Sequence, residues 1–251
     1  MNPSALPRVS PNAVKFFAAY SRRYMRRRFH AIRILKCGQP QRGISRPLVI
    51  YLNHASWWDP LVCLYLSRRW FSDRTSFAPI DAASLQRYGI FRSIGIFGVE
   101  QQSIRGAMSF LRTAIAILGA GRNVVWLTPQ GRFMDVRERP LRLRGGIGAL
   151  AIRMKEVEFL PLAIEYSFWM EPQPEILVSF GESIVPGREP GGWVISMIIG
   201  VLGSFVGAMV GRALGMYREG ETAGFLMALA GAILLTFGYQ AIAHRRDLMR
   251  H

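Results

Sequence analysis

Acidic residues are scarce in this chain of 251 residues, and its first 58 residues contain none. The whole sequence has 16 Asp and Glu against 32 Lys and Arg, which gives a formal charge of +16. Such a balance is typical of proteins that bind nucleic acids or anionic membranes. No zinc-finger spacing, aromatic RNA-binding motif or convincing helix-turn-helix pattern accompanies the charge. Half of the residues are hydrophobic, so we expect membrane lipids as partners and no nucleic acid.

Cysteine is also rare, because the chain has only Cys37 and Cys63. Their positions show neither metal-binding nor redox spacing, and we expect no bound metal or cofactor. No apolar run long enough for a secretory signal peptide precedes the arginines of the N-terminal region. Nothing in the sequence therefore indicates an oxidising compartment.

Residues 53–60, Asn-His-Ala-Ser-Trp-Trp-Asp-Pro, carry the clearest chemical pattern. They follow the apolar run 48–52, which predicts a short buried strand ending at a turn. The Asp59 carboxylate could accept the proton on one nitrogen of the His54 ring and fix its tautomer. The other nitrogen could then take a proton from an attacking hydroxyl. Local chemistry alone leaves open a structural histidine in a turn at a helix start.

Four segments in order resemble the motifs of the 1-acylglycerol-3-phosphate acyltransferase family, over about residues 45–185. They are Asn53-His54 with Asp59-Pro60, residues 95–101, residues 128–132 and residues 159–163. The resemblance implies a glycerolphosphate-acyltransferase-like α/β domain in a membrane-associated enzyme. It also implies that His54 is the general base, that Asp59 is its partner, and that acyl-CoA or acyl-ACP is the co-substrate.

The chain departs from this family at two places. Gln101 ends the second motif where the family usually has arginine, and the third motif reads Pro129-Gln130-Gly131-Arg132 where Pro-Glu-Gly-Thr is usual. Loss of a bidentate guanidinium makes lysophosphatidic acid a doubtful acceptor, although Arg105 or Arg132 could substitute. The resemblance implies these substrate-binding residues: Asn53, Gln101, Arg105, Gln130, Gly131 and Arg132.

The first 40 residues predict a basic, amphipathic helix over about 12–36, with aromatic residues among its arginines. Such a helix suits the surface of an anionic membrane, where each basic residue contributes about 1 kcal/mol. A solvated basic face that covers the enzyme core is the alternative.

Strands and helices then alternate through the predicted acyltransferase domain, residues 41–187, which indicates an α/β sandwich. Predicted strands are 47–52, 76–80, 95–99, 123–128, 158–165 and 175–180. Predicted helices are 59–68, 83–91, 103–119 and 144–155. The last of these helices is opened by Arg142, Arg144 and the glycines at 145, 146 and 148. That start could be an anion site, or the glycines could serve close packing.

Residues 188–251 form a third region with two uncharged stretches, 193–211 and 223–243. Both are long enough to cross a hydrocarbon core of about 30 Å, so we expect a transmembrane helical hairpin. Buried helices of a soluble core are the alternative. Regularly spaced glycines in both stretches would permit oligomerisation through these helices. The tail resembles the transglycosylase-associated small stress membrane proteins.

Taken together, these patterns predict a membrane-bound acyltransferase that moves a fatty acyl group from a thioester to a lysophospholipid or another lipid-like alcohol. Lys and Arg flank both predicted spans, which favours the bacterial inner membrane with the catalytic domain in the cytoplasm. The alternative is a non-catalytic stress or lipid-binding membrane protein with a shortened acyltransferase-like domain. The presence of both His54 and Asp59 argues against that alternative, because a binding module does not need the pair.

Overall fold

The computed structural model describes residues 6–41, 43–138 and 143–187. The chain divides into two compact units, Met1–Val185 and Pro186–His251. The predicted spans 193–211 and 223–243, and with them the predicted oligomerisation surface, lie outside the described residues. Within the described ranges, no helix combines the length and the apolar character needed to cross a membrane.

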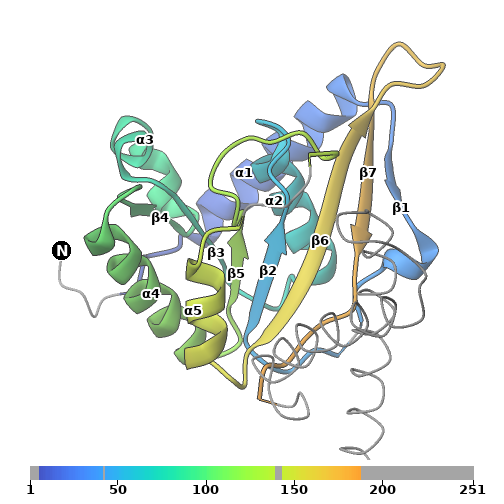
Figure 1. The fold of residues 1–251 in the computed structure, drawn as a ribbon. Coiled ribbons are helices and arrows are strands. Elements are labelled where there is room, and N and C mark those ends of the chain that lie inside the picture. The colour runs from blue at the N-terminus through green and yellow to red at the C-terminus, as the bar shows by residue number, and fades with distance from the viewer. Residues whose placement is uncertain (1–5, 42, 139–142, 188–251) are drawn as a thin grey trace, which may run out of the picture. The chain divides into compact units, whose positions relative to one another are not determined.

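A seven-stranded mixed sheet forms the centre of the first unit (Figure 1). The strands follow the order β1-β7-β6-β2-β5-β3-β4, and every neighbouring pair is parallel except β6 and β7. Their bounds are β1 (Ile32–Ile34), β2 (Leu48–Leu52), β3 (Ser76–Asp81), β4 (Ile96–Val99), β5 (Val124–Leu127), β6 (Glu158–Ser167) and β7 (Glu175–Phe180). Six of these strands match the predicted ones to within two residues at either end.

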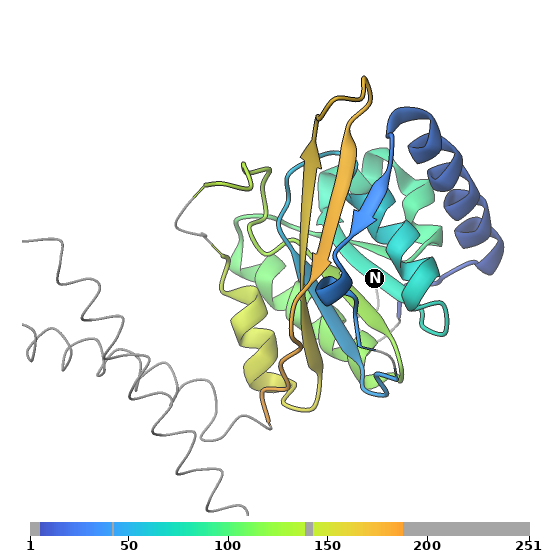
Figure 2. The same cartoon turned by 90° about the vertical axis from the view of Figure 1, so that its right-hand side faces the viewer.

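Helices cover both faces of the sheet (Figure 2). On one face, α1 (Pro11–Arg28) and α2 (Asp59–Trp70) lie over a core that includes Leu48 and Ile50. On the other, α4 (Ile104–Gly119) and α5 (Gly146–Arg153) lie over a core that includes Val49. Side chains alternate along β2, so neighbouring residues enter opposite cores. The predicted α/β sandwich is therefore confirmed for the described part of the chain.

Three predicted helices are too long by more than one residue, and one of them, 144–155, is α5 (Gly146–Arg153) in the structure. The predicted helix 12–36 ends at Arg28, because Phe29 is extended (φ −125°, ψ 140°) and the β-branched Ile32 and Ile34 pair with β7 as strand β1. The prediction of helix was wrong for residues 32–34, because it was based on the basic charge and amphipathic spacing of the whole segment. The predicted helix 83–91 is α3 (Ala82–Arg87) followed by the 3-10 turn Gly89–Ser93, and a second such turn spans Lys36–Gly38.

Helix α1 packs against α2 within the same unit. The Ser21 hydroxyl donates a hydrogen bond of 2.9 Å to the carbonyl oxygen of Leu61, and Met25 is buried. The aromatic residues Phe16 and Tyr20 remain 66% and 51% exposed on the same helix. One side of α1 therefore packs on the core of the unit. The predicted membrane association can involve only the exposed side chains of this helix.

The sheet positions three segments at one of its edges. His54 follows the end of β2, Gln130 follows β5, and Tyr166 lies near the end of β6. Because β2, β5 and β6 are parallel neighbours, their carboxyl ends meet at this edge. Ligands of α/β sheets commonly bind outside the carboxyl ends of the strands.

Candidate active site

His54 and Asp59 form a direct pair at the start of α2. The His54 Nδ1 atom lies 2.7 Å from Asp59 Oδ2, and Asp59 is only 1% exposed. Asp59 is the first residue of α2 and Pro60 follows it, both suitable residues for a first helical turn. The tight turn before α2 thus brings together two side chains that are five positions apart in the sequence.

Two further donors hold the Asp59 carboxylate. The Tyr166 hydroxyl donates a hydrogen bond of 2.6 Å to Oδ1, and the backbone N–H of Ser56 donates one of 3.1 Å to Oδ2. Burial, together with the nearby charge of Asp59, raises the pKa of Tyr166 well above its ordinary value. The phenol therefore stays protonated and remains a donor. Tyr166 was absent from the predicted site, since nothing in the sequence links it to a residue 107 positions earlier.

The backbone of His54 is fixed from both sides. Its N–H donates a hydrogen bond of 3.0 Å to Oε1 of Gln130, and its carbonyl accepts one of 2.9 Å from the N–H of Met134. Next to it, the Asn53 amide forms two hydrogen bonds, of 2.8 and 2.9 Å, with the backbone of Ile164. In this structure Asn53 and Gln130 both hold main chain, and substrate binding by either stays a prediction.

The free edge of the His54 ring is accessible. Its side chain is 20% exposed, and its centroid lies 4.2 Å from that of the Phe133 ring. An ionised carboxylate only accepts hydrogen bonds, so the pair with Asp59 places a proton on Nδ1. Nε2 has no hydrogen-bond partner among the described residues. The arrangement can therefore accept a proton from a hydroxyl group held against the ring.

Arg144 lies against the third motif, beside Gln101. Its backbone N–H donates a hydrogen bond of 2.8 Å to the carbonyl of Pro129. Its Nη2 atom lies 3.4 Å from Gln101 Oε1 and 3.5 Å from the carbonyl oxygen of Gly131. Gly131 has a φ of +67°, and a Cβ there would lie 2.3 Å from Arg144 Nε. The positive φ favours glycine at this turn, whereas the nearby guanidinium belongs to an exposed, flexible side chain that can move away.

The two arginines predicted to bind substrate, Arg132 and Arg105, make fewer contacts than Arg144. Arg132 is exposed, and its Nη2 atom lies 3.7 Å from Glu138 Oε1. Arg105 is exposed in the first turn of α4 and forms no hydrogen bond or ion pair in the described part of the chain. The structure therefore brings Gln101, Gly131 and Arg144 together, but shows no contact of Arg105 with them.

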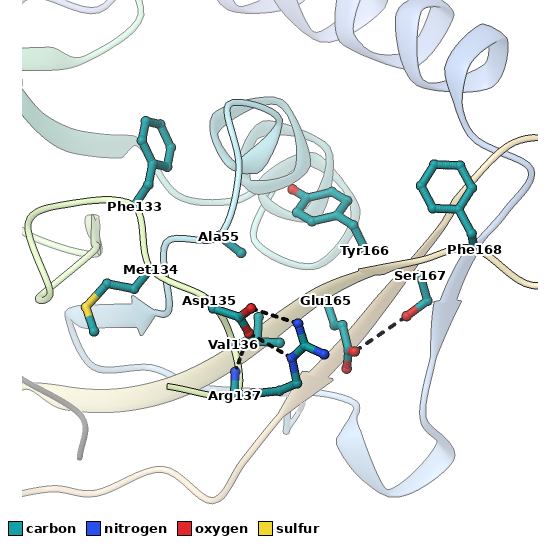
Figure 3. Close-up of a pocket in the computed structure, with 10 residues that line it drawn as sticks. All are labelled: Ala55, Phe133, Met134, Asp135, Val136, Arg137, Glu165, Tyr166, Ser167 and Phe168. Atoms are coloured by element: carbon teal, nitrogen blue, oxygen red, sulfur yellow. Dashed lines mark hydrogen bonds and ion pairs between the residues drawn. The ribbon is translucent and has the colours of Figure 1, made fainter. Parts of the chain in front are cut away.

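A pocket of about 570 Å³ lies next to the pair (Figure 3). Ala55 and Phe133 connect it to His54, while Tyr166 and Phe168 contribute from the end of β6 and beyond. The other lining residues are Met134, Asp135, Val136, Arg137, Glu165 and Ser167. Arg137 pairs with Asp135 at 2.8 Å and holds the pKa of that carboxyl below its usual range. The pocket combines an apolar wall with a charged rim.

Comparisons with known families give two matches to the sequence. Residues 26–165 match the family described as Acyltransferase, and residues 197–244 match the family described as Transglycosylase associated protein. The Acyltransferase match covers more than half of the chain, and the two matches confirm both resemblances seen in the sequence. No curated protein matches this chain.

One similar solved structure is that of the 1-acyl-sn-glycerophosphate (LPA) acyltransferase PlsC from Thermotoga maritima. The two sequences are 13% identical, the alignment covers 70% of each chain, and the TM-score is 0.48.

Proposed function

This chain belongs to the Acyltransferase family, and we propose that it transfers a fatty acyl group from acyl-CoA or acyl-ACP to a lipid-like alcohol. One observation carries the proposal: the 2.7 Å contact between His54 Nδ1 and the buried Asp59 carboxylate. A module that only binds lipid has no need for this contact. The reaction would belong to lipid metabolism, with phospholipid biosynthesis as the expected setting.

The proposed chemistry needs one proton relay. The acceptor hydroxyl oxygen attacks the thioester carbonyl carbon while Nε2 of His54 takes the hydroxyl proton. Asp59 stabilises the charged ring that results. When the tetrahedral intermediate collapses, the C–S bond breaks and the proton passes from His54 to the departing thiolate. Because the thiolate is a good leaving group, positioning of the two substrates and this proton transfer are sufficient.

The third motif forms the acceptor side of the proposed site. The backbone N–H of Gly131 already donates a hydrogen bond of 2.9 Å to the carbonyl of Thr128. We therefore assign contact with the acceptor or the developing oxyanion to the exposed Arg132 guanidinium before the Gly131 amide. With Gln101 and Gln130 in the motifs, we expect neutral or glycosylated lipid alcohols, or lysophospholipids with larger head groups, to be preferred over lysophosphatidic acid.

The proposed location is the bacterial inner membrane, with the catalytic domain and the C-terminal end in the cytoplasm. The match of residues 197–244 to a membrane-protein family supports this location. Single cysteines at Glu219 and Arg250, in a background without Cys37 and Cys63, can be probed on intact cells with an impermeant thiol reagent. We expect labelling at position 219 and none at 250; the reverse pattern would overturn the topology.

The direct test of the reaction is lipid mass spectrometry. Membranes from cells that express the chain should contain newly acylated lipids that are absent with a His54→Ala variant. The identity of these lipids would also define the acceptor. Identical lipid profiles with both forms, at equal expression, would contradict the proposed reaction.

A further inference from the structure

The tip of the β6–β7 hairpin exposes three large apolar side chains in succession. Phe168 is 72% exposed, Trp169 65% and Met170 99%. The hairpin extends beyond the rest of the sheet at the upper right of Figure 1. Phe168 lines the pocket beside His54, whereas Trp169 and Met170 lie beside His30 and Arg33. Consecutive exposed apolar residues on a projecting tip are a feature that marks interaction sites.

The basic end of α1 and the residues that follow it are hydrogen-bonded to the same hairpin. The Gln173 side chain donates a hydrogen bond of 3.0 Å to the carbonyl of Arg27, and the N–H of His30 donates one of 3.0 Å to the carbonyl of Pro174. The last turn of α1 contributes three exposed arginines: Arg26, Arg27 and Arg28. Helix α1 contains no acidic residue.

Glu171 is the acidic residue closest in sequence to the tip. Its carboxylate lies 3.9 Å from the His30 ring. Glu175, further along the hairpin, forms an ion pair with Arg33, which holds the pKa of Glu175 below its usual value. The arginines at the end of α1 therefore outnumber the unpaired acidic groups beside the tip.

We propose that Phe168, Trp169 and Met170, together with Arg26, Arg27 and Arg28, form a docking surface for an anionic lipid bilayer. Aromatic and methionine side chains would enter the boundary between head groups and acyl chains. The arginines would bind the anionic head groups around them. Aromatic residues beside cations suit this interface because it is apolar on one side and wet on the other.

The surface also explains how a lipid acceptor would reach His54, a consequence that depends on the proposed function. Phe168 belongs to the tip and lines the pocket beside the site (Figure 3). Docking would therefore place the pocket next to the bilayer, and an acceptor with its acyl chain in the membrane could enter without crossing water.

The test uses the full chain bound to vesicles, so that the C-terminal region is present in every sample. A Met170→Cys variant, with Cys37→Ser and Cys63→Ala, is labelled with an environment-sensitive fluorophore. Vesicles contain phosphatidylcholine with or without phosphatidylglycerol, and nitroxide-labelled lipid is the quencher. The matched control is Ile152→Cys, 51% exposed near the end of α5, close to where β6 begins.

We expect quenching at position 170 to exceed that at position 152 by at least about twofold, with a blue shift in emission. Replacing Arg26, Arg27 and Arg28 by Gln should reduce quenching in the vesicles that contain phosphatidylglycerol. Equal quenching at both positions, or none at position 170, would overturn the proposal. A shielded probe without lipid quenching would indicate a protein partner and would overturn it too.

A second variant links docking to catalysis without touching the pocket. Trp169→Ser with Met170→Ser should slow transfer to acceptors in vesicles and leave turnover in detergent micelles unchanged. Because quenching measures lipid contact directly, a chain that docks but transfers no acyl group would refute the proposed function and leave the docking surface intact.

Discussion

The two sides of the candidate site are built differently. On the dyad side, formed by His54, Asp59, Gln130 and Tyr166, hydrogen bonds of 2.6–3.0 Å join largely buried groups. The arginine side is formed by Gln101, Gly131, Arg132 and Arg144. There, Arg144 Nη2 lies 3.4 Å from Gln101 Oε1 and 3.5 Å from the Gly131 carbonyl oxygen, and all three polar side chains are exposed.

This difference indicates where precision is needed. Proton transfer depends on a ring held in one position, and buried hydrogen bonds to a charged group supply that constraint. Exposed guanidinium groups are screened by water and bind less strongly, but they can follow head groups of different shape. The site thus joins a fixed reaction centre to an adaptable acceptor side.

Removal of the general base should have the largest effect on activity. We expect His54→Ala to lower kcat/KM by about 10²–10⁴, because a positioned general base acts in the transition state. Asp59→Asn should be nearly as damaging, since asparagine can favour the wrong tautomer of the ring. The measurement is acyl transfer by the purified chain, with thermal unfolding as the control for folding. Wild-type turnover by the alanine variant would remove His54 from the mechanism.

The dyad itself was predictable from sequence because its two members are close along the chain. A histidine after a buried strand and a carboxylate at the next helix start can be recognised locally, and the structure places them at 2.7 Å. The strands were predictable for a similar reason, since their apolar runs are continuous and bounded by turns. Strand β1 was missed because Ile32 and Ile34 are stabilised as a strand by β7, far along the chain.

Tyr166 was not found in this way, and Gln130 was predicted to bind substrate but not to hold the backbone of His54. Tyr166 and Gln130 reach the dyad only because β6 and β5 flank β2 in the sheet. Strand order is a tertiary property, and neither residue carries a local pattern that reveals its partner. Arg144 was noted as part of a helix start, but its position beside Gln101 depends on the path of the chain after β5.

A second prediction concerns the support of Asp59. Tyr166→Phe removes one donor to the carboxylate but keeps the ring, and a hydrogen bond to a charged group is worth about 1.5–3 kcal/mol. We expect kcat to fall about tenfold with little change in KM, because the lost hydroxyl positions Asp59 while the ring that lines the pocket is retained by phenylalanine. Tyr51→Phe is the matched control, as Tyr51 is half-buried on β2 without a hydroxyl hydrogen bond among the described residues. Equal rates for the two variants would exclude a positioning role for Tyr166.

A third, smaller effect should come from the backbone of His54. Gln130→Ala leaves the His54 N–H without its acceptor, and we expect kcat to fall roughly five- to tenfold. Gln130→Glu keeps an oxygen at the same position and should recover most of that loss. Steady-state kinetics of both variants test the idea. If glutamate were as damaging as alanine, the hydrogen bond to His54 would not be what Gln130 contributes.

The smallest effects should appear on the arginine side, as changes of acceptor preference and not of rate. Gln101→Arg would place a second guanidinium within reach of Arg144, and the two cations repel each other unless an anion lies between them. A phosphate would relieve that repulsion and accept hydrogen bonds from both groups. We therefore expect Gln101→Arg to raise the use of lysophosphatidic acid by a few-fold relative to neutral acceptors.

Adding Arg144→Gln should cancel the gain if the two guanidinium groups act together. The measurement is a competition assay with mixed acceptors. A wild-type chain that already clearly prefers lysophosphatidic acid would show that the arginine side binds phosphate without help at position 101, and would reverse the expected acceptor preference.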